Sequence, residues 1–251
     1  MSVADHLILR SQINTERKMQ HRNASKAGAT CAISGAALLC VGTYLHPMEA
    51  NPNEPVAAFT EYAADNFWVS SHLIQLAGVA LLMAALLFLT TVLEARRGPG
   101  IARVAAGGAI ASLALAAALQ AVDGIALKNM VDAWAAAPAS QKGEVFHAAF
   151  AVRQIEVGLA SMSILSFGLT ATLYGVALIG ARIYPTWLAA LAMASGISMI
   201  VSGVVMAYSG FSGLSMAITM PASVILLVWM LMLGVFMWRQ DGVPLDDETS
   251  V

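Results

Sequence analysis

Three pairs of polar side chains stand inside long apolar stretches of the sequence and are the first candidates for chemistry. Within each pair the two residues are three positions apart, which keeps both on one side of a helix. A charge at the depth of a bilayer is costly, so it normally faces protein, has a partner and marks a functional place. We therefore expect six candidate ligand-binding residues: His72 and Gln75, Gln120 and Asp123, and Arg153 and Glu156.

Histidines and carboxylates in the same regions are the residue types that bind a transition metal. His46, His72 and His147 are the candidate metal ligands, with Asp123 and Glu156 as further carboxylate candidates. No close pair such as H-x-x-x-H occurs, so spacing alone selects neither a metal-ligand set nor a pair of haem ligands. The sequence therefore predicts no cofactor, and a zinc or copper site is the alternative.

Two structural interpretations compete with a site. In the first, these side chains lie in water at the membrane surface and fix helix ends, as for His46 beside Pro47. In the second, Asp123 pairs with Arg153 and pins two neighbouring helices together, with little net stabilisation after desolvation. Glu156 then remains as an unmatched carboxylate, and this surplus favours Glu156 as a functional residue that Arg153 positions.

The elements that carry these residues are predicted to be membrane helices. The chain is 59% hydrophobic and only 11% charged, whereas a soluble domain has about 25% charged residues. The apolar residues fall in long runs, which predicts an all-α, polytopic bundle of six transmembrane helices. The predicted spans cover roughly residues 27–45, 69–93, 101–127, 147–182, 187–208 and 217–238.

The depth of each candidate residue follows from counting along its span. Ionisable side chains near one end of the first four spans lie 20 to 26 residues from a charged residue at the other end. At 1.5 Å per residue this is about 30–40 Å, close to the thickness of a bilayer core. The intervals, which bring one residue of each span to a common outer level, are Lys26 to His46, Arg103 to Asp123, His72 to Glu94 and Glu156 to Arg182.

The basic residues predict the orientation. Ten of the thirteen Lys and Arg residues fall in the amino-terminal segment, the 94–103 turn, Arg182 and Arg239, all at one end of the predicted bundle. The positive-inside rule then puts both termini in the cytoplasm of a bacterial inner membrane. We divide the chain into a basic tail (1–26), a six-span domain (27–239) with an outer loop (46–67), and a disordered acidic tail (240–251).

Several stretches of the sequence resemble bacterial multi-pass membrane proteins of a "domain of unknown function" family. They are LHPMEANPNEPVAAFTEYAADNFWVSSHLIQLAGV, LQAVDGIALKNMVDAW, VRQIEVGL and YPTWLAALAMASG. The resemblance covers most of residues 30–210 and implies a fold without an assigned activity. Membrane ceramidase-like zinc hydrolases, which use three His, an Asp and a Ser, are also similar in part. They take a close histidine pair from a late span, and residues 187–238 of this chain contain no histidine.

The favoured expectation is a binding or accessory protein without enzymatic activity, with a polar pocket at the outer ends of the first four spans. Its partners would be the lipid bilayer and a lipid head group, a small polar molecule or another membrane subunit. A metal-dependent hydrolase facing the periplasm and a transporter of apolar small molecules are the alternatives. The last two spans carry no charged residue between Trp187 and Trp238, which argues against an ion-coupled pathway. No basic stripe with interleaved aromatic residues occurs, so nucleic-acid binding is not expected.

Overall fold

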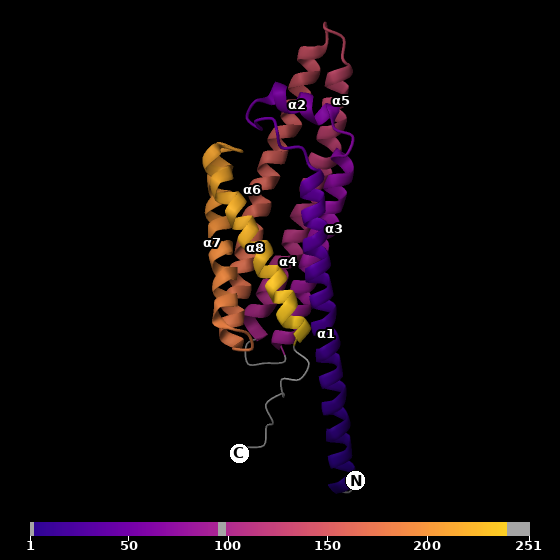
Figure 1. Ribbon diagram of the computed structural model, residues 1–251, viewed down its shortest axis with the longest axis vertical. Coiled ribbons are helices and arrows are strands. Elements are labelled where there is room, and N and C mark those ends of the chain that lie inside the picture. The colour runs from indigo at the N-terminus through magenta and orange to yellow at the C-terminus, as the bar shows by residue number, and fades with distance from the viewer. Residues whose placement is uncertain (1–2, 95–98, 240–251) are drawn as a thin grey trace.

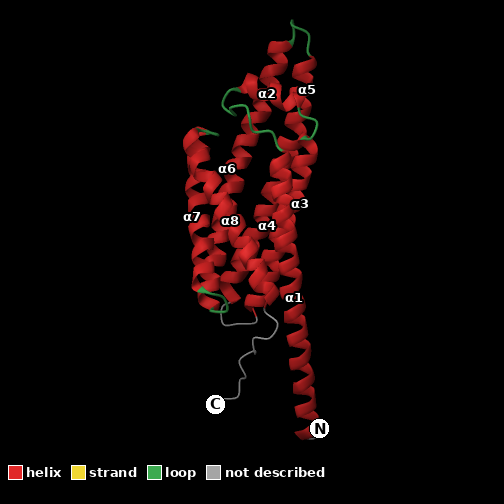
Figure 2. Ribbon diagram, in the orientation of Figure 1, coloured by secondary structure: helices red, strands yellow, loops and turns green. Residues whose placement is uncertain are grey.

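The computed structural model describes residues 3–94 and 99–239, and every regular element in these ranges is helical (Figures 1 and 2). The predicted disordered tail at 240–251 lies outside the described residues. The elements are α1 (Val3–Leu45), α2 (Pro55–Ala64), α3 (Trp68–Glu94), α4 (Pro99–Gln120), a π-helical segment η1 (Ala121–Leu127), α5 (Lys128–Ala136), α6 (Lys142–Ala181), α7 (Thr186–Ser209) and α8 (Gly213–Arg239).

Six helices of the described chain are long and apolar enough to cross a membrane, which confirms the predicted number of spans. The chain therefore has the architecture of a multi-pass membrane protein. The candidate spans are Met19–Leu45, Trp68–Glu94, Gly100–Ala136, Lys142–Ala181, Thr186–Ser209 and Gly213–Arg239.

The six long helices pack as a closed ring. Helix α1 packs against α3 and α8, α3 against α4, α4 against α6, α6 against α7, and α7 against α8. Small residues allow the closest approaches: a Cβ atom on Gly35 of α1 would lie 2.8 Å from the Gly78 carbonyl oxygen of α3. A Cβ atom on Gly168 of α6 would likewise lie 2.6 Å from the Gly196 carbonyl oxygen of α7. Such contacts hold membrane helices together by close backbone packing.

Helix α1 is longer than its predicted span. The basic segment that precedes residue 27 was expected to be a tail outside the spans, but it continues α1 as a single helix from Val3. Its first turns extend beyond the bundle in Figure 1. No Gly or Pro occurs between Val3 and Gly28, so the sequence contains no residue that would break the helix there.

Opposite the amino terminus, α2, α5 and the first turns of α6 form a small domain that we call the cap (Figure 1). Its core is aromatic and aliphatic, with Phe59, Trp68 and Trp134 among its buried residues. The Lys128 ammonium donates to the carbonyl oxygens of Tyr62 and Ala63, at 2.9 and 3.0 Å, and so closes the carboxyl end of α2.

The start of α2 has no side-chain cap. Glu54 occupies the N-cap position, although the preceding Asn53 is of a residue type that caps helices. The Asn53 side chain instead donates to the Phe211 carbonyl oxygen, at 2.6 Å, in the turn between α7 and α8. The loop before α2 is thereby attached to the far side of the ring. Within α2, Phe59 is buried and Val56 is exposed.

Candidate metal centre

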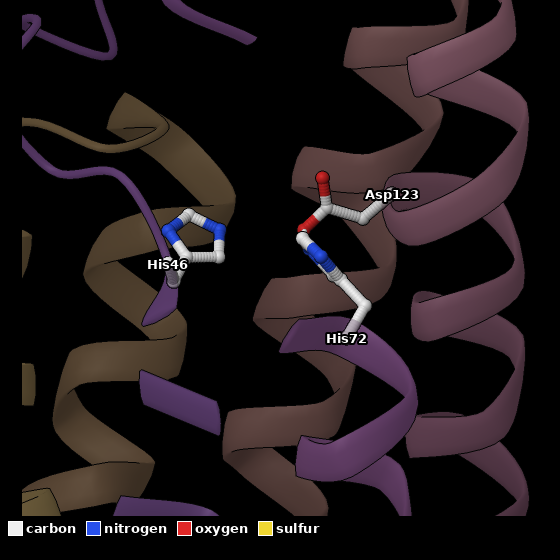
Figure 3. Close-up of side chains that lie close together, drawn as sticks. All are labelled: His46, His72 and Asp123. Atoms are coloured by element: carbon white, nitrogen blue, oxygen red, sulfur yellow. Dashed lines mark hydrogen bonds and ion pairs between the residues drawn. The ribbon is translucent and has the colours of Figure 1, made fainter. Parts of the chain in front are cut away.

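Three of the predicted site residues meet where the cap joins the bundle. His46 directly follows α1, His72 lies in the second turn of α3, and Asp123 lies in η1. Their side chains point toward one another (Figure 3). One possible ligand atom from each lies within 4.8 Å of the other two. In the described part of the chain, this is the one group of three or more His, Cys, Asp or Glu side chains that is arranged in this way.

Backbone carbonyl groups orient both imidazole rings. The His72 ring donates through Nδ1 to the Trp68 carbonyl oxygen at 2.7 Å, and the His46 ring donates through Nδ1 to the Pro47 carbonyl oxygen at 2.7 Å. Each Nδ1 therefore carries a proton, and Nε2 is the nitrogen left for another partner. Histidines that bind a metal through one nitrogen characteristically donate the other N–H in this manner.

The Asp123 carboxylate completes the group. Its Oδ2 atom lies 3.1 Å from His72 Nε2, and its Oδ1 atom is buried without a hydrogen-bond partner. One turn earlier, the Oε1 atom of Gln120 is also buried without a partner, while its amide donates to Gln75 at 3.3 Å. Buried acceptor atoms without donors are destabilising. The two unpaired oxygens therefore call for a cation or a further hydrogen-bond donor at this place.

With Asp123 ionised, two chemical species satisfy its contact with His72. Because the Nδ1 proton of His72 is engaged by Trp68, Nε2 can donate to Asp123 only if the ring is an imidazolium. If the ring is neutral, two lone pairs face each other and a cation must lie between them. A divalent metal ion also supplies a partner for the unpaired Asp123 Oδ1 atom, which the imidazolium does not.

The spacing of the ligand atoms fits a metal ion. Zinc binds imidazole nitrogen at about 2.0–2.1 Å, so two ligand atoms of a tetrahedral site are roughly 3.3 Å apart. The 3.1 Å separation of His72 and Asp123 already matches this value. The group as a whole lies within 4.8 Å, so His46, which stands in the loop just beyond α1, needs to approach by up to about 1.5 Å to reach the tetrahedral spacing.

His46 has the protonation state that a ligand needs. Burial lowers its pKa below the ordinary value of a histidine, and the neighbouring His72 lowers the pKa further. A neutral imidazole is the form that binds a metal. The His46 ring also lies 4.9 Å from the rings of both Trp68 and His72, measured between centroids. This aromatic contact keeps the ring at the mouth of the group.

The π-helical segment positions Asp123. Insertions of this type are rare and are frequently found at functional sites. They free backbone groups from the helical pattern, and here the Asp123 carbonyl oxygen accepts from the Trp68 indole N–H at 3.0 Å. Next to it, a Cβ atom on Gly124 would lie 2.6 Å from the His72 Cβ atom. A glycine is therefore required for η1 to approach His72 this closely.

A second charged group lies beside the metal centre, on α6. Both oxygens of the Glu156 carboxylate accept from Nη1 of Arg153, at 2.7 and 2.6 Å, and both side chains are buried. The guanidinium also lies over the rings of Phe211 and Tyr62, 4.8 and 5.7 Å from their centroids. Its Nη2 atom donates to the Pro52 carbonyl oxygen at 3.5 Å, a long contact.

The structural interpretation in which Asp123 pairs with Arg153 is wrong. Arg153 pairs with Glu156, its neighbour one turn away on the same helix, and Asp123 turns toward His72 on α3. A local partner at three-residue spacing needs no movement between helices, whereas η1 rotates Asp123 toward α3. Asp123 still interacts electrostatically with both Arg153 and Glu156. The three charges sum to minus one, as the sequence indicated.

His147 lies apart from this group. It is exposed, and its ring contacts Phe146 at 5.9 Å between centroids. It precedes Arg153 by six residues, or about 9 Å of helix, so α6 carries it outward into the cap. The structure thus brings together two of the three histidines predicted as metal ligands. The Asp123 carboxylate is the third member of the group.

Sequence reasoning missed Trp68, Gly124 and Tyr62. Trp68 contacts Asp123 and His72, Gly124 makes room for His72, and Tyr62 packs against Trp68 with ring centroids 4.2 Å apart. The glycine directly after Asp123 was a signal that could have been read as a close backbone approach. No signal of comparable strength indicated Tyr62.

No protein-family model, curated protein or solved structure matches the chain.

Proposed function

We propose that this protein binds a divalent transition metal ion through His46, His72 and Asp123. The observation that carries the proposal is the arrangement of the two imidazole rings, whose Nδ1 protons are held by backbone carbonyl groups while Nε2 is left for a ligand. Two imidazoles and one carboxylate suit zinc, and also iron, cobalt or manganese. The role is that of a metal-binding or accessory membrane protein.

The proposal places the cap and the metal centre on the periplasmic side of a bacterial inner membrane, with both termini in the cytoplasm. The support is the distribution of basic residues along the described bundle. At the cap end stand Lys128, Lys142 and Arg153, and of these Arg153 is buried in an ion pair. The opposite end carries Arg22, Lys26, Arg103, Arg182 and Arg239. The excess of positive charge on one side favours that side as cytoplasmic.

A metal-dependent hydrolase is the second candidate. A site with three protein ligands leaves a coordination position open, as catalytic zinc sites do. The likeness to ceramidase-type enzymes is weaker than the sequence indicated, because His147 does not join the group and no third histidine replaces it among the described residues. Hydrolysis of ester or amide substrates by the zinc-loaded protein, lost on removal of zinc, would favour this candidate.

Zinc binding by the purified protein tests the proposal. Equilibrium dialysis followed by metal analysis should give one zinc ion per chain in the wild type. His72→Asn and Asp123→Asn remove a ligand with little change of shape, and they should bind at least about tenfold more weakly. His147→Asn makes the same substitution at the exposed histidine and should bind as the wild type does. Absence of stoichiometric metal from the folded wild type, or equal binding by all variants, contradicts the proposal.

A further inference from the structure

The metal centre and the Arg153–Glu156 pair belong to one buried group of charges. The Tyr62 ring lies 4.2 Å from the Trp68 ring, which contacts His72. The Arg153 guanidinium lies over the same Tyr62 ring, 5.7 Å from its centroid. Asp123 interacts electrostatically with Tyr62, Arg153 and Glu156. The charge at the metal must therefore be considered together with the charges on α6.

The sum of these charges changes sign when a metal binds. With all three groups ionised, Asp123, Glu156 and Arg153 together carry minus one. A divalent ion bound by neutral histidines raises the sum to plus one. A net charge in a poorly solvated place is unfavourable unless a counter-charge is near. One bound monoanion would therefore neutralise the metal-loaded centre.

Two hydrogen-bond donors beside the centre have no acceptor within the described chain. The Tyr62 hydroxyl donates to no described group, and burial raises the pKa of this phenol to about 12, so it keeps its proton at neutral pH. The Nε atom of Arg153 also has no described acceptor, because its hydrogen bonds use Nη1 and Nη2. Guanidinium groups bind oxyanions through such free edges.

We propose that the open position of the metal takes the carboxylate group of a small ligand, whose oxygens are also bound by the Tyr62 hydroxyl and by Arg153. The inference rests on the proposed metal site. A carboxylate supplies the single negative charge that neutralises the loaded centre. A phosphate dianion would instead leave a net negative charge there. The partly exposed Phe211 ring, over which the Arg153 guanidinium lies, offers apolar surface to the rest of such a ligand.

Cobalt(II) substitution makes the inference testable, since the visible spectrum of bound cobalt reports on its coordination. Acetate added to the cobalt-loaded wild type should shift the spectrum in a saturable manner, and inorganic phosphate should act at least tenfold more weakly. Tyr62→Phe removes one hydroxyl and should weaken acetate binding about tenfold. Tyr44→Phe removes a hydroxyl from an exposed side chain and should bind acetate as the wild type does.

The double variant Arg153→Gln/Glu156→Gln keeps the total charge and removes the guanidinium, so it should also lose acetate affinity while retaining cobalt. A cobalt spectrum that does not respond to acetate, or that responds equally in Tyr62→Phe and the wild type, overturns this inference and leaves the metal site intact. Failure of the wild type to bind cobalt at all overturns the metal site, and the inference with it.

Discussion

Replacing Arg153 by methionine should destabilise the protein far more than removing an exposed arginine. Methionine keeps an unbranched apolar stem, but it lacks the guanidinium that lies over Phe211 and Tyr62, and it leaves the Glu156 carboxylate without its partner. The Glu156 side chain is only 2% exposed, so little water can replace the lost guanidinium. Breaking a buried ion pair in this way costs about 3–5 kcal/mol.

The chain offers a matched control in an exposed pair. Arg103 donates to Glu94 at 2.7 Å, as Arg153 does to Glu156, but its side chain is 71% exposed. Arg103→Met should therefore cost about 0–1 kcal/mol. Thermal unfolding in detergent separates the two predictions, because 1 kcal/mol corresponds to roughly 2–4 °C in a chain of this size. We expect a loss of about 6–20 °C for Arg153→Met and of a few degrees at most for Arg103→Met.

The double variant Arg153→Met/Glu156→Met completes the test. Apolar replacement of both partners of a buried pair is often close to neutral, so the double variant should be more stable than Arg153→Met alone. If the double variant is no more stable than Arg153→Met, or if Arg153→Met is no more harmful than Arg103→Met, then the pair is not buried and coupled in the way described.

Three further outcomes are expected. Gly124→Ala should lower stability by about 1–3 kcal/mol and weaken zinc binding, because the added Cβ atom would meet His72. Gly158→Ala should do neither, because a Cβ atom there meets nothing within 4 Å. Equal effects of the two substitutions would show that η1 does not approach His72. Trp68→Phe, which loses the indole bond to the Asp123 carbonyl oxygen, should weaken zinc binding about tenfold or more, and unchanged affinity would remove Trp68 from the support of the site. With Cys31 and Cys40 replaced, a cysteine at position 57 should react with an impermeant thiol reagent added to intact cells and one at position 100 should not; the reverse pattern contradicts the proposed orientation.

The helices were predictable because the information for them is local. Runs of some twenty apolar residues interrupted by charged or Pro- and Gly-containing turns indicate spans without knowledge of their partners. Counting along those spans also placed His46, His72 and Asp123 at one level, and the structure brings their ligand atoms within 4.8 Å. That count measures depth alone, so it could not show which way each side chain faces around its helix.

The π-helical segment was not predictable in the same way. The stretch from Ala121 to Leu127 has the composition of the surrounding α-helix, and its altered backbone depends on tertiary contacts with Trp68 and His72. Because Asp123 in η1 faces His72 on α3, the interpretation that paired Asp123 with Arg153 was wrong. Similarly, Asn53 suits a helix cap by residue type, but the approach of Phe211 from the α7–α8 turn provides a competing acceptor.

X-ray absorption spectroscopy of the zinc-loaded protein tests the metal centre most directly, because the zinc edge reports the ligands themselves. We predict scattering from two imidazole rings with zinc–nitrogen distances of about 2.0–2.1 Å, together with oxygen ligands and no sulfur. His46→Ala should reduce the imidazole contribution to one ring, and His147→Ala should leave the spectrum unchanged. A spectrum with no imidazole, with sulfur, or with the same two rings after His46→Ala would contradict the assignment of His46, His72 and Asp123 as the metal site.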